Sequence, residues 1–175
     1  SATSEEQEIL SRYVGWGGLA DAFDETKSAW ETEYLELKTV LTPEEYAEAR
    51  ASTLNAHYTQ PIVIESMYQA LENMGFTKGN ILEPSMGVGN FFGMLPENLN
   101  QSKLYGVELD SISGRIAKFL YPNANIQIKG YEKTDYPNDF FDVVIGNVPF
   151  GAYKVNDRQY DRYNFMIHDY FLAKT

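Results

Sequence analysis

The chain has 175 residues, a formal net charge of −11, no cysteine and two histidines. The length fits one domain, or one domain with a small appendage. The composition excludes disulfide scaffolds, thiolate metal sites and histidine-rich metal sites, so we expect no bound metal. No apolar run is long enough to span a membrane, and Ser1–Glu8 is too acidic and polar for a secretory signal, so we expect a cytoplasmic protein. Taken alone, the acidity argues against a nucleic-acid partner.

The negative charge is concentrated at the front of the chain. Residues 1–56 hold twelve Asp/Glu and four Lys/Arg, a net charge of −8, whereas residues 57–175 hold thirteen and ten, a net charge of −3. We therefore place a boundary near residues 55–58. It separates an acidic helical N-terminal segment, 1–56, from a second domain, 57–175.

The front segment is expected to contain three helices, at residues 5–14, 29–40 and 43–53. The third has a complete start signal, with Thr42 at the N-cap, Pro43 at the first position and Glu45 at the third. Glycines on both sides of Trp16 end the first helix. The indole of Trp16 either faces a ligand or fills a core, and we favour the core.

From Tyr58 onward, strands alternate with helices. The helix that begins at Pro61 has an apolar face that includes Val63, Met67 and Met74. Strands are expected at 80–83, 103–108, 125–128 and 141–145, and further helices at 91–95, 111–121 and 165–174. Such alternation predicts an α/β fold with a parallel sheet and right-handed crossovers. Ligands of these sheets bind at the carboxyl ends of the strands.

The first strand ends in an acid followed by two glycines. Glu83 is followed by Gly87 and Gly89, which allow a ligand to approach the backbone closely. Phe92 stands where the dinucleotide pattern needs glycine, and no lysine follows, so a phosphate-cradling P-loop is excluded. An acid at this place suits a ligand that carries an ammonium group.

The second strand ends at Glu108, whose carboxylate can accept two hydrogen bonds from ribose hydroxyls. The alternative is an acid that favours the dipole of the next helix, a role that Asp110 fits better because it directly precedes Ser111.

The fourth strand is followed by Asn147-Val148-Pro149-Phe150. The side-chain carbonyl of Asn147 and the backbone carbonyl of Val148 are two acceptors for an exocyclic amine, and Phe150 offers a stacking surface. The alternative is a tight turn with Phe150 in the core.

Together these residues resemble the amino-methyltransferases that use S-adenosylmethionine. Residues 83–91 look like their motif I, Glu108 matches the acid of motif II, and 147–150 looks like motif IV, usually Asn/Asp-Pro-Pro-aromatic. Residues 58–61 look like motif X. The segment from Tyr13 and the tract 52–59 resemble the methyltransferase region of large helicase–methylase proteins carried by phages and conjugative elements.

The resemblance implies a Rossmann-like methyltransferase fold whose parallel sheet is truncated after the fourth strand, preceded by the helical segment. The remaining strands and a helicase region are then partners supplied by a larger parent chain. The implied cofactor residues are Thr59 for the methionine carboxylate, Glu83 for the ammonium, Glu108 for the ribose, Glu132 as a candidate for the adenine, and Pro84, Gly87 and Gly89 of motif I. The implied catalytic residues are Asn147, Val148, Pro149 and Phe150, with valine in place of the usual proline.

The leading hypothesis is methyl transfer to N6 of adenine in DNA, with the base flipped onto Phe150. Lys154, Arg158 and Arg162 would form one basic edge if their stretch were helical; otherwise they are ordinary surface charges. The same chemistry on protein glutamine or RNA guanine N2, and a non-catalytic module of a helicase-type protein, stay open. Because the net charge of the second domain is only −3, we expect this chain to bind DNA weakly by itself.

Overall fold

The computed structural model describes residues 2–53 and 58–175, so the predicted boundary near residues 55–58 lies largely outside the described residues. A parallel sheet forms the centre of the fold, with strand order β3-β2-β1-β4. The strands are β1 Asn80–Glu83, β2 Lys103–Glu108, β3 Asn125–Ile128 and β4 Val143–Val144. The α/β prediction with a Rossmann-like strand order is therefore confirmed.

Strand β4 is shorter than the predicted 141–145. Its backbone contacts nevertheless extend past both ends, because Asp142 N donates to Asn80 O at 3.0 Å and Ile145 N donates to Leu82 O at 2.9 Å. Phe141 leaves the strand and packs edge-on against Tyr105, with ring centroids 5.4 Å apart. The predicted strand is therefore present, although only two residues of the apolar run pair as a strand.

Two layers of helices cover the sheet. One face packs against α4 Pro61–Asn73, α5 Asn90–Gly93 and α6 Ser111–Leu120, and the other against α7 Ile167–Lys174. Adjacent residues of β1 show this division, since Ile81 packs with α4 and Leu82 packs with α7.

The buried face of α4 differs from the predicted one. Ile64 and Tyr68 are buried, whereas Val63 and Met74 are 46% and 74% exposed. The Tyr68 hydroxyl donates to the carbonyl of Phe91 at 2.8 Å, so this tyrosine keeps a hydrogen bond within the core. The helical periodicity was predicted correctly, but the buried face of α4 is rotated so that it includes Tyr68.

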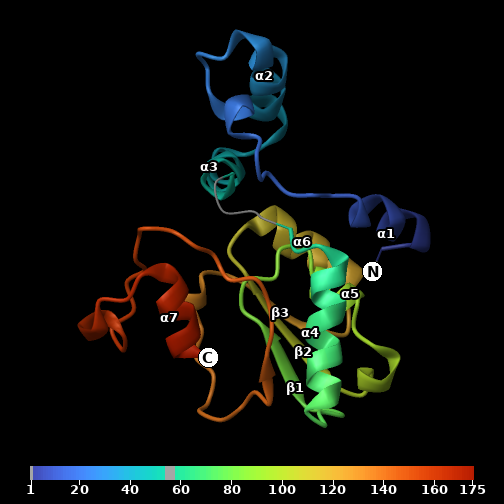
Figure 1. Cartoon of the computed structure of the whole chain (residues 1–175). Helices are drawn as coiled ribbons and strands as arrows, with labels where there is room; N and C mark the ends of the chain where they lie inside the picture. The colour runs from blue at the N-terminus through green and yellow to red at the C-terminus, as the bar shows by residue number, and fades with distance from the viewer. Residues whose placement is uncertain (1, 54–57) are drawn as a thin grey trace.

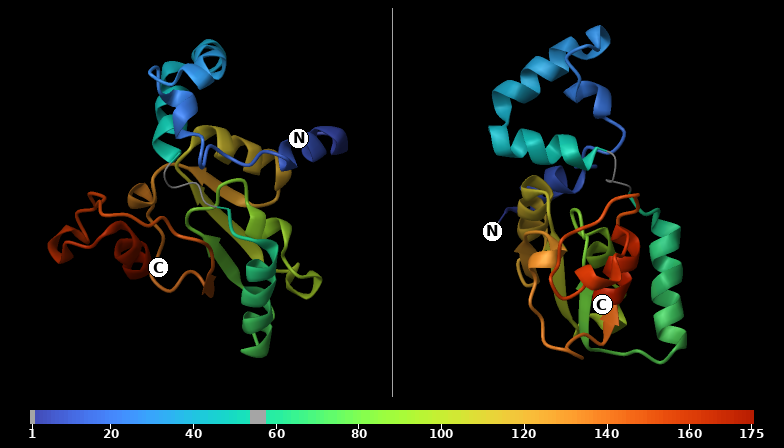
Figure 2. Two further views of the ribbon diagram at one scale, coloured as in Figure 1. Left: turned by 45° about the horizontal axis from the view of Figure 1, so that its top comes forward. Right: turned by 90° about the vertical axis from the view of Figure 1, so that its left-hand side faces the viewer.

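The front segment forms a helical layer of its own. It contains α1 Ser4–Ser11, α2 Glu31–Val40 and α3 Pro43–Ser52, and the predicted capping box at Thr42 and Glu45 is present. Its small core has Ala22, Phe23 and Ala49 at the centre. Figures 1 and 2 show α2 and α3 above α6 at one end of the sheet, whereas α1, in dark blue, lies beside α6.

Candidate functional site

A cavity of about 630 Å³ opens at the carboxyl edge of the sheet. Its walls come from the segments that follow all four strands and from the front segment. The cavity has the size of a small-molecule site. It brings together eight of the residues predicted from the sequence: Thr59, Glu83, Pro84, Gly87, Glu108, Glu132, Asn147 and Pro149.

Glu83, the last residue of β1, is only 2% exposed and lines this cavity. Its Oε2 atom is buried and has no hydrogen-bond partner among the described residues. Burial, with a smaller contribution from the charge of Glu108, raises the pKa of Glu83 well above its ordinary value. A buried carboxylate that lacks a donor is the group that a ligand ammonium would stabilise most.

Glu108, the last residue of β2, is held by two backbone donors. Gly87 N donates to Oε2 at 2.7 Å and Asp110 N donates to Oε1 at 2.8 Å. Burial raises the pKa of Glu108, and these two hydrogen bonds oppose the rise. Because each carboxylate oxygen can accept more than one hydrogen bond, Glu108 retains capacity for two hydroxyl groups.

Asp110, not Glu108, caps the helix that follows β2. Its Oδ2 accepts from Ser113 N at 2.8 Å and from Ser113 Oγ at 2.5 Å. This division leaves Glu108 available for a ligand. Asp110 also lines the cavity, is 5% exposed, and has a buried Oδ1 without a hydrogen-bond partner in the described part of the chain.

The two glycines after β1 have different roles. Gly87 has φ +55° and lines the cavity, and its N–H holds Glu108. Gly89 has φ +88° and precedes α5, and a Cβ atom there would lie 2.6 Å from Cε2 of Tyr121. Gly89 is not among the described residues that line the cavity, so the structure gives it a packing role rather than a place against a ligand.

The residues after β4 divide between the cavity and its surroundings. Asn147 and Pro149 line the cavity, whereas Val148 packs in the apolar cluster around α7. Phe150 is 65% exposed, which contradicts the alternative that placed it in the core. Its ring stacks on His168, with centroids 5.7 Å apart and planes at 26°.

The segment after β3 supplies Glu132 to the cavity wall. The neighbouring Tyr131 lines the cavity too, but it is 5% exposed and stacks on Phe171 with centroids 5.0 Å apart. Tyr131 is therefore engaged in aromatic packing, whereas Glu132 contributes its carboxylate to this wall of the cavity.

The predicted basic edge does not form. Residues 154–162 contain no α-helix, so the i, i+4, i+8 spacing does not align Lys154, Arg158 and Arg162. The Lys154 ammonium donates to Asn164 Oδ1 at 2.5 Å, and the Arg162 guanidinium bonds to the adjacent Tyr163. Lys154 and Arg162 are thus bonded to neighbouring residues of the same loop.

Sequence reasoning missed the contribution of the front segment. Trp16 packs edge-on against Phe23, with centroids 5.5 Å apart, and it also lines the cavity, as do Gly15 and Glu48. The signal in the sequence was the glycine-flanked Trp16, which the core interpretation only half explains. Leu109, directly after the strand-end acid, is a second missed residue; it is 66% exposed and lies at the cavity.

Two further features are absent from residues 2–53 and 58–175. No helix there combines the length and the apolar character that crossing a membrane requires. In the same ranges, no group of three or more histidine or acidic side chains is arranged to hold a metal ion.

Comparison with known proteins gives two similarities. No protein-family model matches the chain. It is 30% identical over 162 residues to "Defense against restriction protein B" of Escherichia phage P1, an alignment that covers 91% of this chain and 6% of that protein. The chain thus spans a small part of its curated relative's length. The plantazolicin methyltransferase BpumL, solved with a monoazolic desmethylPZN analog and SAH, aligns over 80% of this chain and 47% of its own, with 16% identity and a TM-score of 0.42.

Proposed function

We propose that the cavity binds S-adenosylmethionine and that the chain is part of an enzyme that methylates N6 of adenine in DNA. The observation that carries the proposal is the order of strands β2, β1 and β4 in the sheet. It places Glu108, Glu83 and Asn147 one after another along a single cavity. In the cofactor, the sulfonium that carries the transferable methyl group lies between the ribose and the ammonium, so Glu108 and Glu83 would hold the two sides of that sulfonium and Asn147 would approach its methyl group from the neighbouring segment.

The residues present fit this cofactor. The two accepting oxygens of Glu108 match the ribose hydroxyls, and the buried, unpaired Oε2 atom of Glu83 matches the ammonium. Thr59 lies at the same cavity and has a hydroxyl that can donate to the methionine carboxylate. When bound, the cofactor supplies an electrophilic methyl group on a sulfonium.

The acceptor side of the site rests on Asn147, Val148 and Phe150. The side-chain oxygen of Asn147 and the backbone carbonyl of Val148 accept from an exocyclic amine and orient its lone pair, which supplies rate by positioning. Valine keeps the carbonyl that the usual proline provides, and its packing around α7 holds the backbone in place. The exposed ring of Phe150 is available to a flipped base, and stacking is worth about 1–3 kcal/mol per base.

Binding of S-adenosylhomocysteine, measured by calorimetry, tests the cofactor assignment. We expect saturable binding that Glu108→Ala abolishes. Glu65→Ala, which removes an exposed carboxylate of α4, serves as the matched control and should leave the affinity unchanged. Absence of binding by the unmodified chain would refute the assignment.

Methylation assays with labelled cofactor on DNA, RNA and protein test the substrate. Label in the N6 position of adenine in DNA supports the proposal. Label in protein glutamine or in guanine N2 of RNA would assign the same chemistry to another substrate. Cofactor binding by the full-length parent without methylation of any of the three would indicate a non-catalytic module. We also propose that tight DNA binding depends on regions of the parent outside this chain, including a helicase region.

A further inference from the structure

The front segment forms one wall of the cavity that the proposed function assigns to the cofactor. Gly15 and Trp16 come from the loop after α1, and Glu48 comes from α3. The other walls come from Tyr58 and Thr59, which precede α4, and from the segments after the strands, which begin more than thirty residues after Glu48. The cavity is therefore completed by a part of the chain that lies outside the sheet domain.

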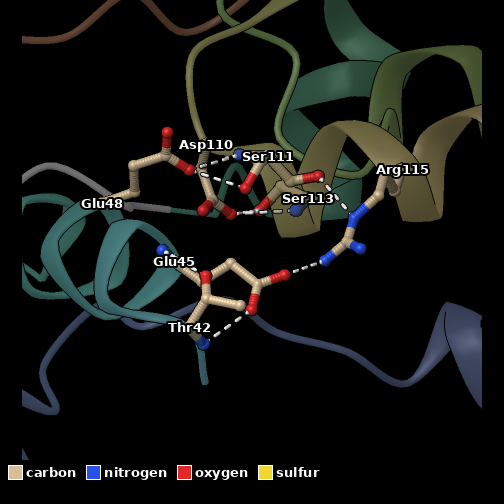
Figure 3. Close-up of polar contacts among 7 residues, drawn as sticks. All are labelled: Thr42, Glu45, Glu48, Asp110, Ser111, Ser113 and Arg115. Atoms are coloured by element: carbon tan, nitrogen blue, oxygen red, sulfur yellow. Dashed lines mark hydrogen bonds and ion pairs between the residues drawn. The ribbon is translucent and has the colours of Figure 1, made fainter.

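Two polar contacts hold this wall against α6. Glu48 Oε2 accepts from Ser111 Oγ at 2.6 Å and from Ser111 N at 3.2 Å (Figure 3). One helical turn further along α6, Arg115 Nη2 pairs with Glu45 Oε1 at 2.5 Å. Both contacts lie on the first turns of the helix that begins directly after Asp110, so the wall is attached beside the strand-end acids.

Glu45 is well placed to act as a rigid anchor. Its Oε2 accepts from Thr42 N at 3.0 Å and its own N–H donates to Thr42 Oγ1 at 3.2 Å, as the capping box of α3 requires. The other oxygen, Oε1, is left for Arg115 (Figure 3). The same carboxylate thus starts α3 and ties it to α6.

The seam between the front segment and the sheet domain holds buried polar atoms without partners. Tyr13 Oη, Trp16 Nε1 and Asp110 Oδ1 make no hydrogen bond among the described residues. The rings of Tyr13 and Trp16 lie 6.1 Å apart, and burial together with the nearby charge of Asp110 raises the pKa of Tyr13. Buried polar atoms are normally paired, so Trp16 Nε1 and Asp110 Oδ1 are the atoms of this seam with which a bound ligand could pair.

The position of the wall indicates which end of the ligand it covers. Helix α6 connects β2 to β3, so the wall lies on the Glu108 side of the cavity, away from Asn147 after β4. We infer that the front segment, through Trp16, covers the adenosine end of the cofactor and sets its affinity. This inference rests on the proposed function, which places the ribose at Glu108.

Intrinsic fluorescence tests the contact directly, because the chain has two tryptophans. Trp30 packs in the same front cluster as Trp16 but is not among the described residues that line the cavity. In Trp30→Phe, the emission of Trp16 should change saturably as S-adenosylhomocysteine is added. In Trp16→Phe, the emission of Trp30 should stay constant. An unchanged emission in Trp30→Phe, or equal changes in both variants, would overturn the inference.

Affinity measurements distinguish the effect of Trp16 as part of the cavity wall from its effect on packing within the front cluster. Trp16→Leu and Tyr46→Leu each remove one aromatic ring that packs on Phe23, but of these two rings only that of Trp16 lines the cavity. We expect S-adenosylhomocysteine to bind Trp16→Leu about tenfold more weakly, the loss typical of removing an aromatic surface from a base site. Tyr46→Leu should stay within about twofold of the unmodified chain. Circular dichroism checks that both variants are folded.

The outcomes distinguish this inference from the proposed function. If the unmodified chain binds S-adenosylhomocysteine and Glu108→Ala abolishes binding, while Trp16→Leu binds normally, the inference alone is wrong. Equal weakening by Trp16→Leu and Tyr46→Leu would also refute it, because only the packing of the front cluster would then matter. If the unmodified chain does not bind at all, both proposals fail.

Discussion

Replacing Glu83 with glutamine should raise the stability of the ligand-free chain while weakening its affinity for the cofactor. The carboxylate is 2% exposed and its Oε2 has no donor, and burial raises its pKa well above the ordinary value. The native state therefore binds more protons at this site than the unfolded state does. As pH rises through the range between the unfolded and native pKa values, stability is lost.

The size of the effect follows from the cost of an unpaired buried group. Leaving a buried polar group without a partner costs about 1–3 kcal/mol, and more when it is charged. At pH 8 we expect Glu83→Gln to be more stable than the unmodified chain by about 1–3 kcal/mol. For a chain of this size, each kcal/mol corresponds to about 2–4 °C in Tm. Near pH 4 the carboxyl group is protonated in the native state, and the two proteins should be almost equally stable.

Urea unfolding at pH 4.5 and pH 8, followed by circular dichroism without ligand, measures this difference. Glu108→Gln is the matched comparison, because both of its oxygens accept backbone N–H groups, from Gly87 and Asp110. An amide nitrogen would face one of those donors, so Glu108→Gln should destabilise the chain by about 1–2 kcal/mol.

Calorimetry with S-adenosylhomocysteine completes the test of Glu83. Loss of a charge-assisted hydrogen bond, worth about 1.5–3 kcal/mol, should weaken binding by roughly 10- to 150-fold. Parallel pH profiles for Glu83→Gln and the unmodified chain would refute the electrostatic argument. Unchanged affinity would refute the role of Glu83 toward the ammonium.

Three further substitutions test other parts of the structure. Gly89→Ala should lower the free energy of unfolding by at least about 1–2 kcal/mol, because φ is +88° and the new Cβ would lie 2.6 Å from the Tyr121 ring; urea denaturation measures it. Phe150→Ala should leave S-adenosylhomocysteine affinity within about twofold but reduce methylation at least about tenfold, whereas Glu108→Ala should lose both, in parallel binding and activity assays. Tyr68→Phe removes the 2.8 Å hydrogen bond to Phe91 O and should cost about 1 kcal/mol in thermal unfolding.

The strands and the acids that end them were predictable because both depend on local patterns. The bounds of β1, β2 and β3 agree with the residues expected from apolar runs and turn signals. Once those strands are parallel, Glu83 and Glu108 must lie at one edge, so the core of the candidate site followed from topology. The capping box at Thr42 was predictable for the same reason, since all its contacts lie within four residues.

Other features depend on which surfaces of the folded chain pack against one another, and no local sequence pattern specifies that packing. The face of α4 rotated because Tyr68 reaches a carbonyl in a distant segment. The basic edge of Lys154, Arg158 and Arg162 failed because turns, not a helix, form there. By contrast, the role of Asp110 at the start of α6 was already predicted from its place directly before Ser111, and the hydrogen bond from Ser113 N to its side chain confirms it.

The uneven charge of the chain shows the same division. The sequence by itself determined a parallel α/β domain, its strand-end acids and an acidic front segment, because periodicity, capping and charge are local properties. Tertiary structure alone decided that this front segment is part of the site. Contacts of Glu45 and Glu48 with α6 span more than sixty residues (Figure 3). Trp16 of the same front segment lines the cavity. Such long-range pairing depends on the packing of complete surfaces, which a linear pattern does not encode.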